Sequence, residues 1–149
     1  MNQTLKTTAL ATVMLMAASL TASAADIEVK LLNKGADGTA MVFEPGFVRA
    51  AVGDTIKFMP TDKGHFVQGL PNMWPEGVAD VKGKVGEELD VKVEKDGFYA
   101  FKCAPHFAMG MVALIQVGNA PVTDAIKAIS VPGPAGKRIA ADLELAAKP

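Results

Sequence analysis

A short segment near the C-terminal end of the chain concentrates side chains that bind soft metal ions. Between Cys103 and Met111 it reads CAPHFAMGM, which contains the only cysteine of the chain, one of its two histidines and two of its eight methionines. Apolar residues recur at strand spacing from 98 to 103 and again from 111 to 117, which predicts a strand on each side of the segment. The fold must therefore hold these potential ligands in a tight connection between two strands.

Similar short apolar stretches cover most of the chain before this segment. Residues that favour turns separate them, and a longer loop from 61 to 84 interrupts the series. Many short strands with turn signals between them are typical of an all-β sandwich or barrel, and we predict a sandwich of about eight strands. Besides the two strands already named, the expected strands lie at 27–31, 41–43, 47–51, 55–59 and 89–93.

After Gly118 the apolar residues recur at helical spacing instead. Pro132-Gly133-Pro134 interrupts the pattern, so we expect two short helices that pack an apolar stripe onto the sandwich. This change predicts a β-sandwich over 25–118 and a C-terminal helical extension over 119–149. The expected stripe comprises Val122, Ala125, Ile126, Ile129, Ile139, Leu143 and Ala146.

Residues 1–24 have the pattern of a cleaved signal peptide. Lys6 supplies the positive start, residues 8–20 are apolar, and Ala22-Ser23-Ala24 matches the small-residue site of signal peptidase. We therefore predict cleavage after Ala24. The apolar stretch is too short to cross a bilayer comfortably, and no second hydrophobic span follows it. We expect an exported, periplasmic protein without a membrane anchor.

The charge balance and the cysteine count narrow the function further. Without Lys6, the mature chain carries 14 basic and 16 acidic residues, and this balance argues against nucleic-acid binding, which requires a strongly basic face. Exported proteins usually pair their cysteines in disulfides, so the solitary Cys103 is unusual. Its thiol must be inert in the core, paired with another chain, catalytic or bound to a metal.

The residues around Cys103 favour the metal. An imidazole at His106 and thioethers at Met109 and Met111 share its loop, and His65, the other histidine, lies in a loop after a predicted strand. Two imidazoles and a thiolate in a plane, with a weak axial thioether, suit copper in both of its oxidation states. Each of these residues alone more often has a packing role. Their coincidence in one exported β protein predicts a copper site.

Three motifs extend this pattern along the chain. They are Asn33-Lys34-Gly35 with Met41-Val42-Phe43-Glu44-Pro45, then Pro60-Thr61-Asp62-Lys63-Gly64-His65, and finally Lys102-Cys103-x-Pro105-His106-x-x-Met109-Gly110-Met111. In these motifs the sequence resembles the cupredoxins, the type-1 blue copper proteins, and especially their pseudoazurin branch. The resemblance implies a cupredoxin-like Greek-key β-sandwich, a single copper ion and an electron carrier rather than an enzyme. The implied copper ligands are His65, Cys103, His106 and Met111.

Met109 is the alternative to Met111 for the axial position. The spacing in cupredoxins selects Met111, and the strand periodicity agrees, because Met111 begins the inward face that Ala113 and Ile115 continue. Met109 precedes the flexible Gly110 and is expected at the surface.

Two positions depart from the cupredoxin pattern. Proteins of this type usually have Asn after the first histidine, and pseudoazurins usually have a hydroxyl residue after the cysteine, whereas this chain has Phe66 and Ala104. Both partners of a polar contact between the ligand loops are thus replaced by apolar groups, which can be nearly neutral for stability. We expect copper binding to persist, with effects on the reduction potential and the loop rigidity. The backbone N–H of Phe66 can still donate to the sulfur of Cys103.

The resemblance also implies how redox partners would dock on a monomeric carrier. His106 would form the exposed edge of the centre inside an apolar collar, and a ring of lysines would steer acidic partners into brief encounters. The implied partners are a copper-containing nitrite reductase of the denitrifying pathway and c-type cytochromes. The collar comprises Met41, Pro105, Phe107 and Met109, and the ring comprises Lys34, Lys63, Lys82 and Lys102.

Two other functions fit parts of the pattern. A periplasmic copper carrier or store would account for the many methionines, although such sites tend to be open and sulfur-dominated, which two histidines and one cysteine fit poorly. Cys103 and His106 could instead form a thiol nucleophile with its base. The tight loop with Pro105 between them, and the lack of an obvious orienting carboxylate or oxyanion-hole motif, argue against an enzyme.

Overall fold

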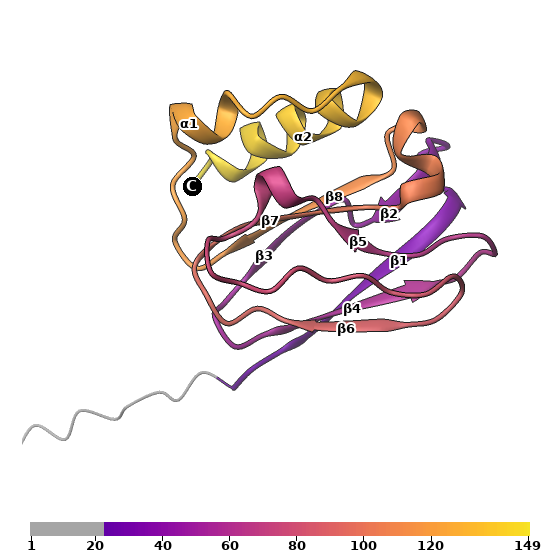
Figure 1. Cartoon of the computed structure of the whole chain (residues 1–149), viewed down its shortest axis with the longest axis horizontal. Coiled ribbons are helices and arrows are strands. Elements are labelled where there is room, and N and C mark those ends of the chain that lie inside the picture. The colour runs from indigo at the N-terminus through magenta and orange to yellow at the C-terminus, as the bar shows by residue number, and fades with distance from the viewer. Residues whose placement is uncertain (1–22) are drawn as a thin grey trace, which may run out of the picture.

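Short apolar stretches at strand spacing produce eight strands over residues 23–149, the part of the chain that the computed structural model describes. The strands form two four-stranded sheets that pack face to face, with helices at one side (Figure 1). The predicted β-sandwich with C-terminal helices is therefore confirmed. The predicted signal peptide, residues 1–24, lies outside the described residues except for its last two positions.

The first sheet has one polar face and one apolar face. In its strands the buried Val29, Leu31 and Val91 alternate with exposed charged residues such as Lys30 and Lys92, so its outer face contacts solvent. β1 pairs in parallel with β4, and the other pairings are antiparallel. The strand order is β2-β1-β4-β6, with β1 at Asp26–Lys34, β2 at Ala40–Glu44, β4 at Thr55–Pro60 and β6 at Leu89–Lys92.

The second sheet differs because it is covered on both faces. Its last strand along the chain, β8, lies between β3 and β7, parallel to β3 and antiparallel to β7. All six residues of β8 are buried, which is typical of a strand with apolar layers on both sides. The strand order is β3-β8-β7-β5, with β3 at Phe47–Ala50, β5 at Gln68–Gly69, β7 at Gly97–Lys102 and β8 at Val112–Val117.

The inner core lies between the two sheets and contains several aromatic rings. The rings of Phe58 and Phe101 have centroids 4.5 Å apart, and Trp74 contacts both Phe101 and Tyr99 edge to face. The face of β7 that carries Tyr99 and Phe101 continues to Cys103, as predicted. The matching face of β8 carries Ala113, Ile115 and Val117 and begins at Met111.

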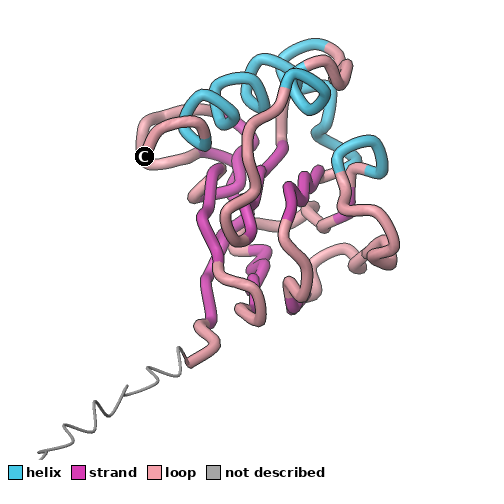
Figure 2. Tube along the Cα trace, turned by 90° about the vertical axis from the view of Figure 1, so that its left-hand side faces the viewer, coloured by secondary structure: helices cyan, strands magenta, loops and turns pink. Residues whose placement is uncertain are grey.

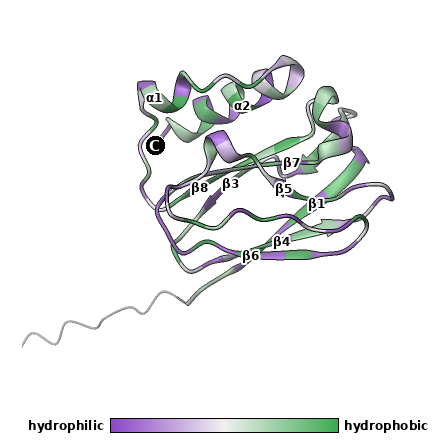
Figure 3. Cartoon of the chain, in the orientation of Figure 1, coloured by the Kyte–Doolittle hydropathy of each residue, from purple (hydrophilic) through white to green (hydrophobic). Residues whose placement is uncertain are grey.

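Helix α2 (Gly133–Ala146) covers the outer face of the second sheet (Figures 1 and 2). Figure 3 shows apolar residues, in green, on α2 and on the strands β7 and β8. The predicted stripe residues Ile139, Leu143 and Ala146 are buried against this face. The sheet contributes Phe98, Ala100, Val112 and Leu114 to the same cluster.

The first of the two predicted C-terminal helices is much shorter than the second. It is the single turn α1 (Asp124–Lys127), which begins after Thr123, whose hydroxyl accepts the N–H of Ile126. Three of its four predicted stripe residues pack against the cluster between α2 and the second sheet, namely Val122, Ile126 and Ile129. The prediction was wrong for Ala125, which is exposed. One turn presents too narrow a face to bury all four residues of the expected stripe.

The C-terminal end of α2 is fixed by a side chain of the sheet. Arg49 of β3 donates from Nη2 to the carbonyl oxygens of Leu145 and Lys148, at 2.9 and 2.6 Å. The last carbonyl groups of a helix lack partners within it, and a cation is favourable beside them.

Among residues 23–149, no helix has the length and apolar character needed to cross a bilayer.

The predicted loop from 61 to 84 contains structure that the sequence did not indicate. β5 occupies two of its residues, and a 3-10 turn, η1 (Pro71–Met73), follows. Gln68 of β5 pairs with Lys102 on one side and with Lys82 on the other. Two residues are too few for a periodic pattern, so only the neighbouring strand β7 defines this edge.

Candidate metal centre

The segment between β7 and β8 forms a 3-10 helix, η2 (Ala104–Met109), closed by backbone hydrogen bonds. The N–H of Cys103 donates to Met111 O at 3.0 Å. This hydrogen bond extends the pairing of β7 with β8 by one position beyond its last residues, Lys102 and Val112. Within the loop, the N–H of His106 donates to Cys103 O, and the N–H of Met111 donates to His106 O. Three of the four predicted ligands are thus connected through the backbone alone.

His65 reaches the same place from a distant part of the chain. It lies in the connection between β4 and β5, after Gly64, whose φ of +87° is a conformation that side chains with a Cβ rarely adopt. Its carbonyl accepts the N–H of Gly86 at 2.9 Å, and its side chain is completely buried. The loop therefore delivers the imidazole into the interior, 38 positions before Cys103 in sequence.

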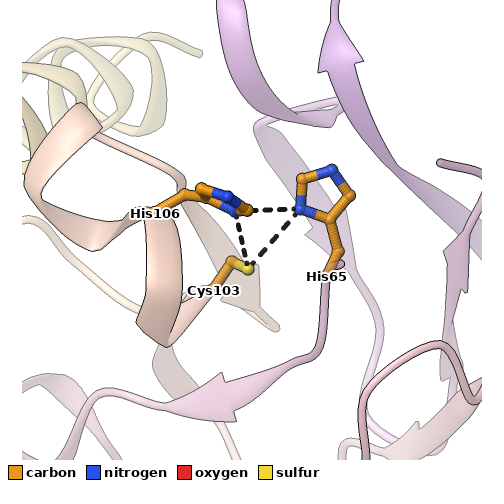
Figure 4. A group of neighbouring side chains, drawn as sticks. All are labelled: His65, Cys103 and His106. Carbon is orange, nitrogen blue, oxygen red and sulfur yellow. Dashed lines mark hydrogen bonds between the residues drawn. The ribbon is translucent and has the colours of Figure 1, made fainter. Parts of the chain in front are cut away.

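Three donor atoms converge at the end of the sandwich (Figure 4). The Nδ1 atoms of His65 and His106 are 3.1 Å apart, and Cys103 Sγ lies 3.7 Å from the first and 3.5 Å from the second. A point equidistant from the three atoms lies about 2.0 Å from each of them, which is close to ordinary metal–nitrogen and metal–sulfur bond lengths. The size of the triangle therefore fits a single metal ion.

Asn33 at the end of β1 orients the buried histidine. His65 Nε2 lies 3.0 Å from Asn33 Oδ1, which can only accept, so Nε2 carries the proton and Nδ1 directs its lone pair toward the other two donors. The prediction from sequence did not include this role. Asn33 is 32 positions from His65, and only its place in one of the recognised motifs singled it out.

The surroundings of the donors favour the metal-binding form of His65 but not that of Cys103. Burial lowers the pKa of His65, and His106 lowers it further, so the imidazole stays neutral as a ligand must. Burial raises the pKa of the Cys103 thiol, and the backbone N–H groups of Phe66 and His106 offset this only in part. The predicted donation from the Phe66 N–H to the sulfur stays a prediction. A bound cation favours the thiolate.

The two methionines of the loop have different environments. Met111 is completely buried among the residues of the inner core, whereas Met109 is 48% exposed. Met111 is also bonded through both its N–H and its carbonyl to the ligand candidates His106 and Cys103. The structure therefore places Met111 in the interior beside the donor triangle and Met109 at the surface.

The residues of the predicted collar and lysine ring, like the half-buried His106, all reach the surface at least in part. Pro105 and Met109 are exposed, and Met41 and Phe107 are half-buried. The predicted lysines Lys34, Lys63 and Lys82 are exposed, and Lys102 Nζ lies 5.3 Å from the centroid of the Phe107 ring.

The fold and the donor triangle define a copper-binding β-sandwich, and a comparison with known families agrees. The model of the copper binding proteins of the plastocyanin/azurin family matches residues 29–118. The chain therefore belongs to this family, the cupredoxins. Copper is the cofactor of this family, and two imidazoles with one thiolate are the donors expected at a type-1 copper site.

Individual relatives narrow the class to pseudoazurins. A pseudoazurin of Paracoccus pantotrophus is 49% identical over 87% of this chain and 89% of its own length. The crystal structure of native pseudoazurin from Hyphomicrobium denitrificans superposes with a TM-score of 0.77 at 46% identity, over 80% of this chain and 97% of that chain. The structure of pseudoazurin from Methylobacterium extorquens AM1 gives 0.74 at 45% identity, over 80% and 98%. The chain is thus a blue copper electron-transfer protein of the pseudoazurin branch.

Proposed function

We propose that this protein carries single electrons between redox proteins of the periplasm, with one copper ion held by His65, Cys103, His106 and Met111. The convergence of three donors, whose atoms all lie within 4.8 Å of one another, is the observation that carries the proposal. When bound, copper supplies a one-electron couple between its two oxidation states.

The residues around the donors limit how far the donors can move. Asn33 fixes the ring of His65, and the bonds of Cys103 with Met111 and of His106 with Cys103 fix the loop. Donors that are already in place need little rearrangement when the charge of the centre changes. A small rearrangement favours fast electron transfer, and a buried site excludes water from the centre.

Met111 is the proposed axial ligand, and Met109 belongs to the docking surface. Burial and backbone bonding support the choice of Met111, since a weak axial bond requires a thioether held in the interior. Met109 is half-exposed and can contact a partner instead.

His106 is the proposed contact point for partners, because it is the only member of the donor triangle that is not fully buried. Pro105, Phe107 and Met109 surround it in the same loop, and Met41 completes the apolar collar. A small apolar surface excludes water during an encounter but lets the partner dissociate.

The four lysines of the predicted ring are proposed to steer acidic partners to this collar. Two of them have a structural connection, because Lys82 and Lys102 pair with Gln68 from opposite sides. Lys34 follows Asn33, and Lys63 precedes His65 by two residues. The proposed partners are those that the resemblance implied, a copper-containing nitrite reductase and c-type cytochromes.

Export by a signal peptide completes the proposal. Residues 1–24 would be removed, which leaves a monomer with the sandwich over 25–118 and the helical extension over 119–149.

Visible spectroscopy of the copper-loaded mature protein tests the centre. We expect intense absorption from charge transfer between the Cys103 sulfur and copper, which is reversibly bleached by one electron. Cys103→Ser should lose the colour and keep its circular dichroism spectrum, because the core of the sandwich does not depend on the metal. A strongly coloured Ser variant would disprove the ligand assignment, and rapid loss of copper to mild chelators without redox cycling would favour a copper carrier instead.

A matched pair of variants tests the axial ligand. Met111→Leu should change the reduction potential and the ratio of the visible bands, because the axial ligand tunes both. Met109→Leu should leave both unchanged. The opposite result would exchange the roles of the two methionines.

The salt dependence of electron transfer tests the lysine ring. Raising the ionic strength should slow the reaction with an acidic partner, since screening weakens steering. Lys63→Glu should slow it at low salt more than Lys127→Glu, because Lys127 lies in α1 at the other end of the molecule (Figure 1). Rates that are independent of salt and of both substitutions would remove the ring from the proposal.

A further inference from the structure

Arg138 of α2 connects the helix to the segments that border the metal centre. Its Nη1 donates to Gly110 O at 2.6 Å and to Met41 O at 2.7 Å, and its Nη2 donates to Ala40 O at 3.0 Å. These carbonyl groups belong to the end of the ligand loop and to the first two residues of β2. One side chain therefore holds three backbone segments together: the helix, the ligand loop and the strand that carries a collar residue.

The contact with Gly110 lies one peptide bond from the proposed axial ligand. The carbonyl of the Gly110–Met111 peptide accepts from Arg138, and its N–H donates to His106 O at 3.2 Å. This peptide is therefore held from both sides, by the helix and by a proposed ligand residue. Its orientation determines where the side chain of Met111 begins.

The contact with Met41 supports an uncommon backbone conformation. Met41 has a φ of +50°, and it is the only residue other than glycine with a positive φ among residues 23–149. Residues with a Cβ adopt this region at an energetic cost, which the surrounding structure must offset. The hydrogen bond from Arg138 to the Met41 carbonyl is one such compensation, and it fixes a collar residue beside the centre.

Close packing also joins the ligand loop to the first turns of α2. Gly110 has a φ of +91°, and a Cβ at this position would lie 3.0 Å from Pro134 Cβ and 3.2 Å from Arg138 Nε. The backbone of the ligand loop thus touches the first turns of α2 directly. A displacement of these first turns, rather than of the C-terminal end of the helix, would move Gly110 and the peptide that precedes Met111.

From these contacts we propose that Arg138 is a positioning residue for the copper centre. By fixing the Gly110–Met111 peptide and the Met41 backbone, it sets the placement of the axial thioether and of the collar, so that α2 tunes the centre without supplying a ligand. This inference rests on the proposed assignment of Met111.

Arg49 provides a matched control, because the chain contains two arginines and both join α2 to the sheets. Arg49 also donates to backbone carbonyl groups, but at the C-terminal end of the helix, at Leu145 and Lys148. Its loss should loosen the docking of α2 without touching the ligand loop. A comparison of the two arginines separates positioning of the centre from general support of the helix.

The test compares the copper-loaded mature protein with R138A, R138K and R49A by visible and electron paramagnetic resonance spectra, reduction potential, and hydrogen exchange of the Met111 amide. R138A should remain coloured but show a changed ratio of visible bands and a shifted potential. Its Met111 amide should exchange roughly tenfold faster, the effect of losing one net hydrogen bond. R138K should restore part of each property, because one ammonium group can replace some of the three contacts. R49A should lose stability and keep the wild-type spectra, potential and exchange rate.

Two results would overturn the inference. One is a wild-type spectrum, potential and Met111 exchange rate in R138A. The other is an equal change in R138A and R49A, which would indicate helix docking alone. If R138A does not fold, R138K supplies the same readouts. A colourless wild-type protein would disprove the proposed function instead, and exchange at Met111 in the metal-free protein would still report on the arginine.

Discussion

The two faces of the second sheet are equally buried, but they lead to different structures. On the inner face, Tyr99 and Phe101 continue to Cys103, so the core between the sheets ends in the donor atoms. On the outer face, Phe98 and Ala100 end beneath α2, which contributes no member of the donor triangle. The metal centre therefore lies at the end of the inner core, between the two sheets. The outer core, between the second sheet and α2, holds the helix in place.

The largest expected effects come from two neighbouring residues that point to opposite faces. Leu114 and Ile115 are both completely buried in β8, and their partners in β7 are Ala100 and Tyr99. Leu114→Ala and Ile115→Ala should each lower the free energy of unfolding by about 2–5 kcal/mol, the usual cost of such cavities. Chemical denaturation of the metal-free proteins measures this loss.

The same pair also tests the division between the two cores. We expect Ile115→Ala to release copper to a chelator faster than Leu114→Ala does, because only the inner core continues to the donors. Equal release rates at similar stability would mean that both faces support the centre to the same extent.

A smaller effect is expected from Asn33, which supports the inner side of the centre. Asn33→Ala removes the acceptor for His65 Nε2 and should weaken metal binding about 10- to 100-fold, as is usual when a ligating histidine loses its partner. Competition titrations with a redox-inert divalent metal measure the change, and the exposed Asn119→Ala is the control. An unchanged affinity would show that the two loops alone orient the ring.

The smallest expected effect concerns the carboxyl group of Asp142 in α2. Burial raises the pKa of Asp142 on α2 from 3.8 to about 6, against the attraction of Arg138. Between these two pH values the folded protein binds more protons than the unfolded chain, so this group lowers stability as the pH rises from about 4 to about 6. A shift of this size corresponds to about 3 kcal/mol at most, and partial exposure reduces the expected effect to roughly 1–2 kcal/mol.

Asp142→Asn should therefore stabilise the protein at pH 7 and have little effect near pH 4. Thermal unfolding at both pH values measures the difference, with the exposed Glu144→Gln as the control. A stabilisation of the same size at both pH values would contradict the assignment of the effect to this carboxylate.

Features that depend on neighbours in sequence were predictable. The strands beside the ligand segment, the inward direction of Met111 and the buried residues Ile139, Leu143 and Ala146 follow from the spacing of apolar side chains. Cys103, His106 and the two methionines could be assigned to one loop for the same reason, since strands define both ends of the loop.

Features that depend on tertiary contacts were not predictable. The bond between Asn33 and His65 and the contacts of Arg138 join residues at least 28 positions apart, which no periodicity reports. β5 is too short for a pattern and exists because β7 lies beside it. The one-turn length of α1, which leaves Ala125 exposed, likewise follows from local packing rather than from helical spacing.

The position of β8 has a consequence for how the chain acquires its fold. The strand that separates β3 from β7 is nearly the last to be synthesised, and α2 follows it. A chain that ends at Lys102 leaves the edges of both β3 and β7 without their partner, and such edges promote association between chains. Contacts between distant segments also slow folding. We therefore expect a polypeptide that stays unfolded until its synthesis is complete and then forms sheet, helix and ligand pocket together.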